Sequence, residues 1–153
     1  MSESSGCRVV VVGASTPIGV AIAERFAGAG GAVVGISLEP AGHDALTADL
    51  VADCADPATA TAAIEEAVGT LGGLDVLVPA AGVMPIAPAH RTTDDQWRAA
   101  LASCLDTFFF TARAALAHLG DSGAIVAVSS VNRNSSGIET GLRWLNGVGG
   151  RAG

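Results

Sequence analysis

The sequence predicts a doubly wound α/β fold, in which helices cover a parallel sheet of five strands. Runs of β-branched residues alternate along the chain with longer segments whose apolar side chains recur at helical spacing. The first run lacks the alternation of polar and apolar residues that a half-exposed strand shows, so it is typical of a strand buried on both faces. Glycines or an Asp-Pro pair separate the segments.

The first half of the chain contains three predicted strands and one helix. Residues 7–12 and 32–36 are rich in valine and form the first two strands, and residues 46–51 form a short third one. Between the first two, apolar side chains within residues 18–26 recur every three or four positions, which predicts a helix. Glycines from Gly28 onward end that helix.

A second helix is predicted to begin at Asp56-Pro57. The Asp56 side chain can accept hydrogen bonds from the unpaired amides of the first turn, and Pro57 suits the first helical position because its missing N–H would have no partner there. Gly72 and Gly73 end this helix, and residues 75–78 form the fourth strand.

A long helix is predicted over residues 94–119. Thr93 and Gln96 have the spacing of a capping box, which marks its start. Its apolar residues at helical spacing share one face: Trp97, Leu101, Leu105, Phe108, Ala112 and Leu116. After a turn, residues 124–128 form the fifth strand.

Length and composition predict one domain, residues 1–131, followed by a glycine-rich tail, 132–153. Half of the 153 residues are apolar, which suffices for a packed core.

The net charge is −7 and no basic run occurs, so nucleic acid and anionic membrane surfaces are excluded as partners. Three dispersed cysteines predict reduced thiols in a cytoplasmic protein and no metal site.

The turn after the first strand carries the first functional signal. Gly13 stands where the chain must bend sharply, and Gly19 where the following helix must approach the sheet closely. The helix N-terminus presents amides and a partial positive charge, which suit the pyrophosphate of a dinucleotide. An ordinary strand–helix turn without a ligand remains the alternative.

Four segments in this order resemble the short-chain dehydrogenase/reductase family, over residues 7–131. Gly13 and Gly19 match the first and last glycines of the family's TGxxxGxG motif. The other three matched segments are residues 53–57 (DCADP, similar to the family's Asp-Val segment), 75–82 (DVLVPAAG, similar to DVLVNNAG) and 125–130 (IVAVSS, similar to IVNISS). Family members are longer, so the resemblance implies a Rossmann-type dinucleotide-binding domain that is truncated relative to the family.

The resemblance implies an NAD(P)-dependent oxidoreductase that moves a hydride between nicotinamide and the carbon of an alcohol or carbonyl substrate. It implies that Ser130 is the catalytic serine and that Asp53 and Cys54 lie at the adenine. The other residues implied to contact the coenzyme lie at the pyrophosphate and along the adenosine and its ribose: Gly13, Ser15, Ile18, Gly19, Ser37, Ala80, Ala81 and Gly82.

The family's acid–base pair is missing from this chain. The resemblance places its tyrosine near Arg143, its lysine near Gly147 and its asparagine at Cys104, and the sequence contains no Tyr and no Lys. A guanidinium stays protonated at neutral pH, so Arg143 cannot exchange the proton. The chain alone is therefore expected to be a very poor dehydrogenase. A catalytically inactive nucleotide-binding or interaction protein and a truncated gene product stay open as alternatives.

NAD is slightly favoured over NADP. Ser37 ends the second strand, where an acidic side chain would hold the ribose hydroxyls, and no Arg lies in the glycine loop or in residues 37–44 to hold a 2′-phosphate.

The resemblance also implies a homo-oligomer through the helix 94–119, where the consecutive phenylalanines 108–110 cannot all face the sheet.

Overall fold

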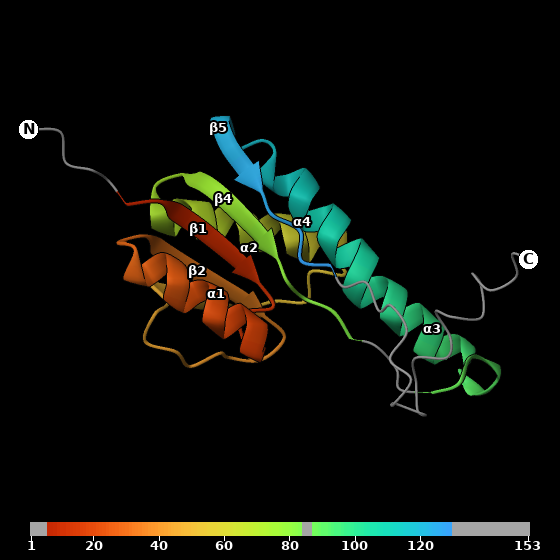
Figure 1. Ribbon diagram of the computed structural model, residues 1–153. Coiled ribbons are helices and arrows are strands. Elements are labelled where there is room, and N and C mark those ends of the chain that lie inside the picture. The colour runs from red at the N-terminus through yellow and green to blue at the C-terminus, as the bar shows by residue number, and fades with distance from the viewer. Residues whose placement is uncertain (1–5, 84–86, 130–153) are drawn as a thin grey trace, which may run out of the picture.

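Five parallel strands form one sheet in the computed structural model, which describes residues 6–83 and 87–129. The strands lie in the order β3-β2-β1-β4-β5, and every neighbouring pair is parallel (Figure 1). Their bounds are β1 Arg8–Val12, β2 Ala32–Ser37, β3 Ala48–Val51, β4 Leu74–Pro79 and β5 Leu119–Ile125. The predicted doubly wound sheet of five strands is confirmed. The predicted tail, 132–153, lies outside the described residues.

Helices cover the two faces of the sheet unequally. Helices α2 (Pro57–Leu71) and α4 (Thr107–Ala115) pack on one face, and α1 (Pro17–Gly28) packs on the other (Figure 1). The remaining helical elements are η1 Ala89–Arg91, α3 Asp94–Leu101 and the π-helical η2 Ala102–Asp106. Among the described residues, no helix combines the length and the apolar content needed to cross a bilayer.

Side chains of the first turn cap the helices at the predicted places. The Asp56 side chain accepts a hydrogen bond from the amide of Thr59 at 2.8 Å, and Pro57 is the first residue of α2. Thr93 and Gln96 form the capping box at the start of α3. These caps satisfy amides that have no partner within the helix, so they fix where each helix begins.

Strand β1 runs through the middle of the core. Val10 and Val12 face α2 and α4, and Val9 and Val11 face α1, all with 2% or less of their surface exposed. A strand buried on both faces needs apolar side chains at every position, which explains the uninterrupted valine run.

Strand β5 begins earlier than predicted. Leu119 pairs with Leu74, but the next pair is Ala124 with Val76, so residues 120–123 bulge out of the ladder. A Cβ atom at Gly123 would lie 2.8 Å from the Cβ of Leu119, so a glycine allows the bulge to fold back on Leu119. The predicted segment 124–128 does run along β4, since backbone amides donate to β4 carbonyls as far as Val128.

The helix predicted over residues 94–119 is a chain of three segments, α3, η2 and α4, that ends at Ala115, because Leu119 already pairs with β4. Most of its predicted apolar face is turned to solvent, although Ala112 packs against the core. The exposed fractions lie between 37% and 64% for Trp97, Leu101, Leu105 and Leu116. The face of α4 buried in the core carries small residues instead: Thr107, Thr111 and Ala115. Small side chains let α4 lie close to α2, and the Thr111 hydroxyl donates to the Thr107 carbonyl at 2.7 Å, so its burial costs little. In Figure 1, α3 extends past the sheet and has no strand beneath it.

An ion pair joins the starts of β1 and β4. The Arg8 guanidinium donates to both carboxylate oxygens of Asp75, at 2.7 and 3.0 Å, and to the Gly72 carbonyl at 2.9 Å. The backbone amide of Arg8 donates to the same carboxylate at 2.8 Å. These hydrogen bonds, that of the guanidinium first, lower the pKa of Asp75 to about 2.

We expect this ion pair to make stability depend on pH in the acid range. Because the folded-state pKa of Asp75 lies below the unfolded value of about 3.9, its contribution is present above that pH and is lost as pH falls toward about 2. Asp75→Asn should lower the free energy of unfolding by about 1 kcal/mol at pH 6, since both side chains are partly exposed. Urea denaturation at several pH values checks this, and an equal loss by native protein and variant between pH 5 and about 2.5 would contradict it.

Candidate dinucleotide site

The carboxyl ends of the five parallel strands meet at one edge of the sheet. Strands that follow β1 in the sequence lie on both sides of it in the sheet: β2 and then β3 on one side, β4 and then β5 on the other. In open α/β sheets, a crevice for ligands lies at such a switch point. The loop from Gly13 to Thr16, which links β1 to α1, lies at this point.

Gly13 occupies a position that no other residue fits. Its φ is 89°, and its amide donates to the Ile36 carbonyl at 2.7 Å, which ties the loop to the end of β2. A Cβ atom at Gly13 would lie 2.7 Å from the Cα of Ala81 and 2.9 Å from the carbonyl carbon of Ala80. The sharp bend predicted at Gly13 is therefore present, and the segment after β4 packs directly against it.

Gly19 lets α1 begin directly above the loop. A Cβ atom at Gly19 would overlap the carbonyl oxygen of Gly13 and lie 2.8 Å from the Cα of Ala14. Both neighbours are backbone atoms, which cannot rotate away. The structure thus brings Gly13 and Gly19 into direct contact, as the spacing in the sequence predicts.

Most amides of this loop already have partners. Thr16 is the cap of α1: its hydroxyl accepts from the Gly19 amide at 3.0 Å, and its own amide donates to the Gly13 carbonyl at 3.1 Å. Pro17 has no amide hydrogen. Among the described residues the Ile18 amide has no hydrogen-bond partner. Ile18 is therefore the donor that the N-terminus of α1 offers to an anion.

Ser15 and Ser37 contact each other. The Ser15 amide donates to the Ser37 hydroxyl at 2.9 Å, and only 5% of the Ser37 surface is exposed. The amide of Ser15 is thus engaged within the protein, whereas the Ser37 hydroxyl keeps its own proton as a donor. Sequence reasoning missed this bond because its partners lie on different elements.

Asp53 and Cys54 face opposite directions. Asp53 is exposed, and its Oδ1 accepts from the Ala55 amide at 3.0 Å. The Cys54 side chain is 3% exposed and lies in the core beside α2, where burial raises the pKa of its thiol to about 11. Of this pair, only Asp53 presents its side chain at the edge of the sheet, so Cys54 can reach a ligand through its backbone alone.

The segment after β4 is held by the π-helical element η2, which sequence reasoning did not find. Ala80 continues the ladder through its amide, which donates to Val12 at 2.8 Å. Val83 donates its amide to the Ser103 hydroxyl at 3.1 Å, and the Cys104 sulfur lies 3.6 Å from the Val83 carbonyl. A Cβ atom at Gly82 would lie 3.1 Å from that sulfur. Two consecutive side chains of η2 thus fix the position of residues 80–83.

The chemical groups expected for hydride transfer are sparse in the described part of the chain. Ser130 lies outside the described residues. Cys104, at the position of the family's asparagine, is exposed and contacts backbone rather than an acid or a base. No group of three His, Cys, Asp or Glu side chains within residues 6–83 and 87–129 has an arrangement suited to a metal ion.

A parallel sheet with a glycine-lined helix N-terminus at its switch point defines an α/β protein of the dinucleotide-binding class. Residues 8–141 match the short chain dehydrogenase family, to which this chain belongs. The chain corresponds to the N-terminal part of the family's fold.

Similar proteins include oxidoreductases known from their sequences and solved short-chain dehydrogenases. An uncharacterized oxidoreductase of Methylorubrum extorquens is 34% identical over 86% of this chain and 57% of its own length. D-threitol dehydrogenase of Mycolicibacterium smegmatis is 32% identical over 79% of this chain and 51% of its own length. A Burkholderia cenocepacia short chain dehydrogenase, solved in complex with NADP, superposes with a TM-score of 0.73 at 29% identity, over 82% of this chain and 56% of that one. The chain thus spans about half the length of its relatives.

Proposed function

We propose that the edge of the sheet between β1 and β4 binds a nicotinamide dinucleotide. The observation that carries this proposal is the close packing of the loop: Gly13 and Gly19 meet backbone atoms that leave no room for a Cβ, so the N-terminus of α1 lies directly at the carboxyl end of β1. The diphosphate lies at the N-terminus of α1, where the Ile18 amide donates to it. The family supplies independent support, since a solved relative holds NADP.

The adenosine half of the coenzyme extends along the ends of β2 and β3. Asp53 accepts from the adenine amino group, and the Ser37 hydroxyl donates to a ribose oxygen. Ala80, Ala81 and Gly82 line the other side of the adenosine. Bound coenzyme would supply the hydride, while these residues bind and orient it.

The same residues favour NAD over NADP. A 2′-phosphate needs a cationic partner, and residues 37–44, which begin at the last residue of β2, contain Glu39 and Asp44 but no Arg. We expect NADH to bind at least about tenfold more tightly than NADPH, a difference of about 1.4 kcal/mol. Calorimetric titration with both coenzymes tests the proposal. Absence of heat with either one would refute dinucleotide binding, and tighter binding of NADPH would refute the preference alone.

The family's chemistry acts on an alcohol or carbonyl, and relatives are named as D-threitol and galactitol 2-dehydrogenases. We propose that residues 1–153 retain coenzyme binding but not effective proton transfer, because no Tyr or Lys is present. A second candidate, residual dehydrogenase activity with Ser130 polarising the substrate oxygen, rests on the matched IVAVSS segment.

Three free thiols, those of Cys7, Cys54 and Cys104, support a cytoplasmic location.

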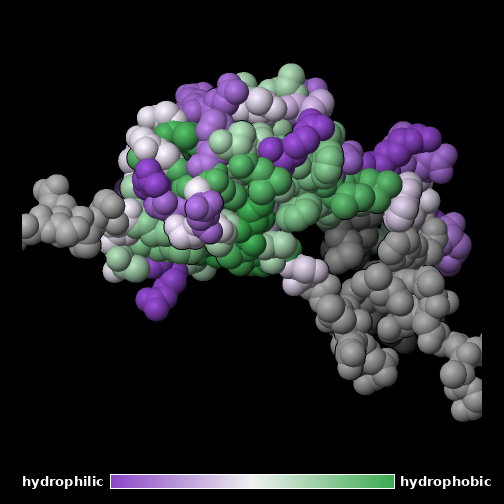
Figure 2. Space-filling view, turned by 90° about the horizontal axis from the view of Figure 1, so that it is seen from above, coloured by the Kyte–Doolittle hydropathy of each residue, from purple (hydrophilic) through white to green (hydrophobic). Residues whose placement is uncertain are grey.

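We propose self-association through the exposed apolar stripe of α3, η2 and α4. In this stripe Leu101, Leu105 and Phe109 follow at intervals of four and are 37%, 57% and 52% exposed. From above, apolar side chains form a broad area bordered by hydrophilic ones (Figure 2). Sedimentation velocity should show a dimer that Leu105→Glu dissociates by at least about tenfold, because a charge would be buried in the interface. A variant that sediments like the native protein would contradict this.

A further inference from the structure

The segment that follows β4 has few contacts of its own to hold its end in place. Residues 79–83 (PAAGV) carry no polar side chain. The Ala80 amide still donates to the Val12 carbonyl at 2.8 Å, but among the described residues no backbone–backbone hydrogen bond joins residues 81–83 to another element. Val83 is 59% exposed, so burial does not hold it either. The position of this end therefore depends on side chains of another element.

The Ser103 hydroxyl of η2 supplies the main contact. It accepts a hydrogen bond from the Val83 amide at 3.1 Å, and its own proton can go to the Val83 carbonyl at 3.4 Å or to the Ala100 carbonyl at 3.3 Å. The Cys104 sulfur lies 3.6 Å from the same Val83 carbonyl. Both backbone groups of Val83 thus have partners on two adjacent side chains of one helical element.

The π-helical turn explains why two adjacent side chains reach the same residue. In an α-helix of 3.6 residues per turn, neighbouring side chains point about 100° apart. In η2 the Thr107 amide donates to the Ala102 carbonyl, five residues back, so the turn is wider than an α-helical one. Ser103 and Cys104 lie in this wider turn, and both contact Val83.

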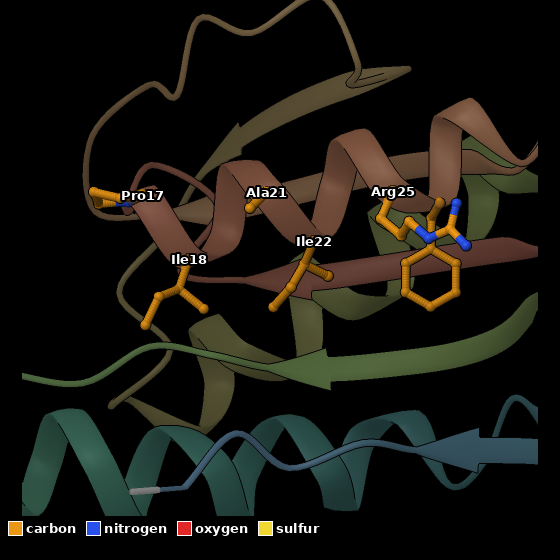
Figure 3. Close-up of a pocket in the computed structure, with 6 residues that line it drawn as sticks. Pro17, Ile18, Ala21, Ile22 and Arg25 are labelled. Carbon is orange, nitrogen blue, oxygen red and sulfur yellow. The ribbon is translucent and has the colours of Figure 1, made fainter.

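Residues 80–82 form one wall of the proposed coenzyme site. Ala81 packs against the bend at Gly13, where a Cβ atom would lie 2.7 Å from the Ala81 Cα. Ile18, the proposed donor to the diphosphate, points away from the axis of α1 on the side of β4 (Figure 3). The wall is attached at both ends, by the ladder with β1 and by the hydrogen bond of Val83 to η2. A wall that is already in place need not be ordered when a ligand binds, and this saves binding free energy.

We propose that Ser103 is a positioning residue for the coenzyme: it holds Val83 and thereby keeps residues 80–82 in place against the adenosine. This inference rests on the proposed function. Ser103 acts through the segment and does not itself contact the coenzyme. Without its hydroxyl, the Val83 amide loses its partner and the wall is in place in fewer molecules. Loss of one hydrogen bond of ordinary strength should reduce the affinity for the coenzyme by about fivefold.

Calorimetric titration of the native protein, Ser103→Ala and Ser103→Thr tests this proposal. We expect Ser103→Ala to bind NADH about fivefold more weakly. ADP-ribose, which lacks the nicotinamide, should lose the same factor because the wall contacts the adenosine. Ser103→Thr keeps the hydroxyl and should restore the binding of both ligands. Hydrogen exchange of the Val83 amide in the free protein should become faster in Ser103→Ala and stay native in Ser103→Thr.

Thr61→Ala is the matched control. The Thr61 hydroxyl is an exposed helical hydroxyl of α2 that donates to the Pro57 carbonyl at 2.9 Å, so its removal also deletes a hydrogen bond to backbone. This variant should bind NADH like the native protein.

Three results would overturn the role of Ser103 alone. They are native affinity for NADH in Ser103→Ala, a loss with NADH but not with ADP-ribose, and a Ser103→Thr protein that binds as weakly as Ser103→Ala. The second would assign Ser103 to the nicotinamide half, and the third would assign the loss to packing rather than to the hydroxyl. Absence of NADH binding by the native protein would instead refute the proposed function, and this inference with it.

Discussion

Gly19→Ala should lower the free energy of unfolding by about 3 kcal/mol and abolish coenzyme binding. The added Cβ would overlap the Gly13 carbonyl and lie 2.8 Å from the Cα of Ala14. Gly13 and Ala14 directly follow β1, and the Gly13 amide is bonded to the Ile36 carbonyl, so these backbone atoms cannot yield without breaking the link between the loop and β2. The helix must therefore shift outward, and its Ile18 amide shifts with it.

Gly69→Ala is the control for this substitution. Gly69 also lies in a helix, α2, but a Cβ there would meet nothing within 4 Å. Alanine should stabilise the protein by about 0.5–1 kcal/mol, because it restricts the unfolded chain more than glycine does. Urea denaturation and NADH titration of both variants check the pair. A Gly19→Ala protein that is as stable as the native protein and binds NADH equally well would contradict the proposed packing of the loop.

Residues 1–153 should bind NADH yet reduce a carbonyl substrate at least about 10²-fold more slowly than a full-length relative. A general acid works best when its pKa lies near the operating pH, and the chain has neither Tyr nor Lys to supply one. Arginine stays protonated, and His43 is engaged, since its Nδ1 accepts from Ala45 at 3.1 Å and its Nε2 lies 3.2 Å from Glu24.

The assay follows NADH absorbance with erythrulose or tagatose as substrate, in parallel with D-threitol dehydrogenase of Mycolicibacterium smegmatis. Ser130→Ala is the control that separates the two candidate functions. If turnover comes within about tenfold of the relative's rate and Ser130→Ala abolishes it, the proposal of binding without proton transfer is wrong. A background rate that Ser130→Ala leaves unchanged agrees with it.

The sequence predicted the architecture well because local signals determine it. Valine runs define strands buried on both faces, and Asp56-Pro57 and Thr93 define helix starts through side chains that cap neighbouring amides. The glycine spacing of the loop was also informative, since Gly13 and Gly19 meet backbone atoms that leave no room for a side chain.

What the sequence did not predict depends on contacts between distant elements. Periodicity located the apolar face of residues 94–119, but small residues such as Thr111 and Ala115 pack in the core while Leu105 faces solvent. Likewise, no pattern indicates that Ser37 takes the Ser15 amide, or that Ser103 holds Val83. Such contacts follow from how the elements pack, which alternating and helical patterns do not encode.

The NMR signal of the Ile18 amide tests directly whether the turn after β1 binds the diphosphate of the coenzyme. In an NMR titration of ¹⁵N-labelled protein with NADH, we expect a saturable shift of the Ile18 amide signal, together with that of Gly13. The Ala62 amide, on the far face of the sheet, should stay in place. Shifts confined to other regions, or an Ile18 signal that does not move at saturating NADH, would contradict the claim that this turn holds the coenzyme's diphosphate.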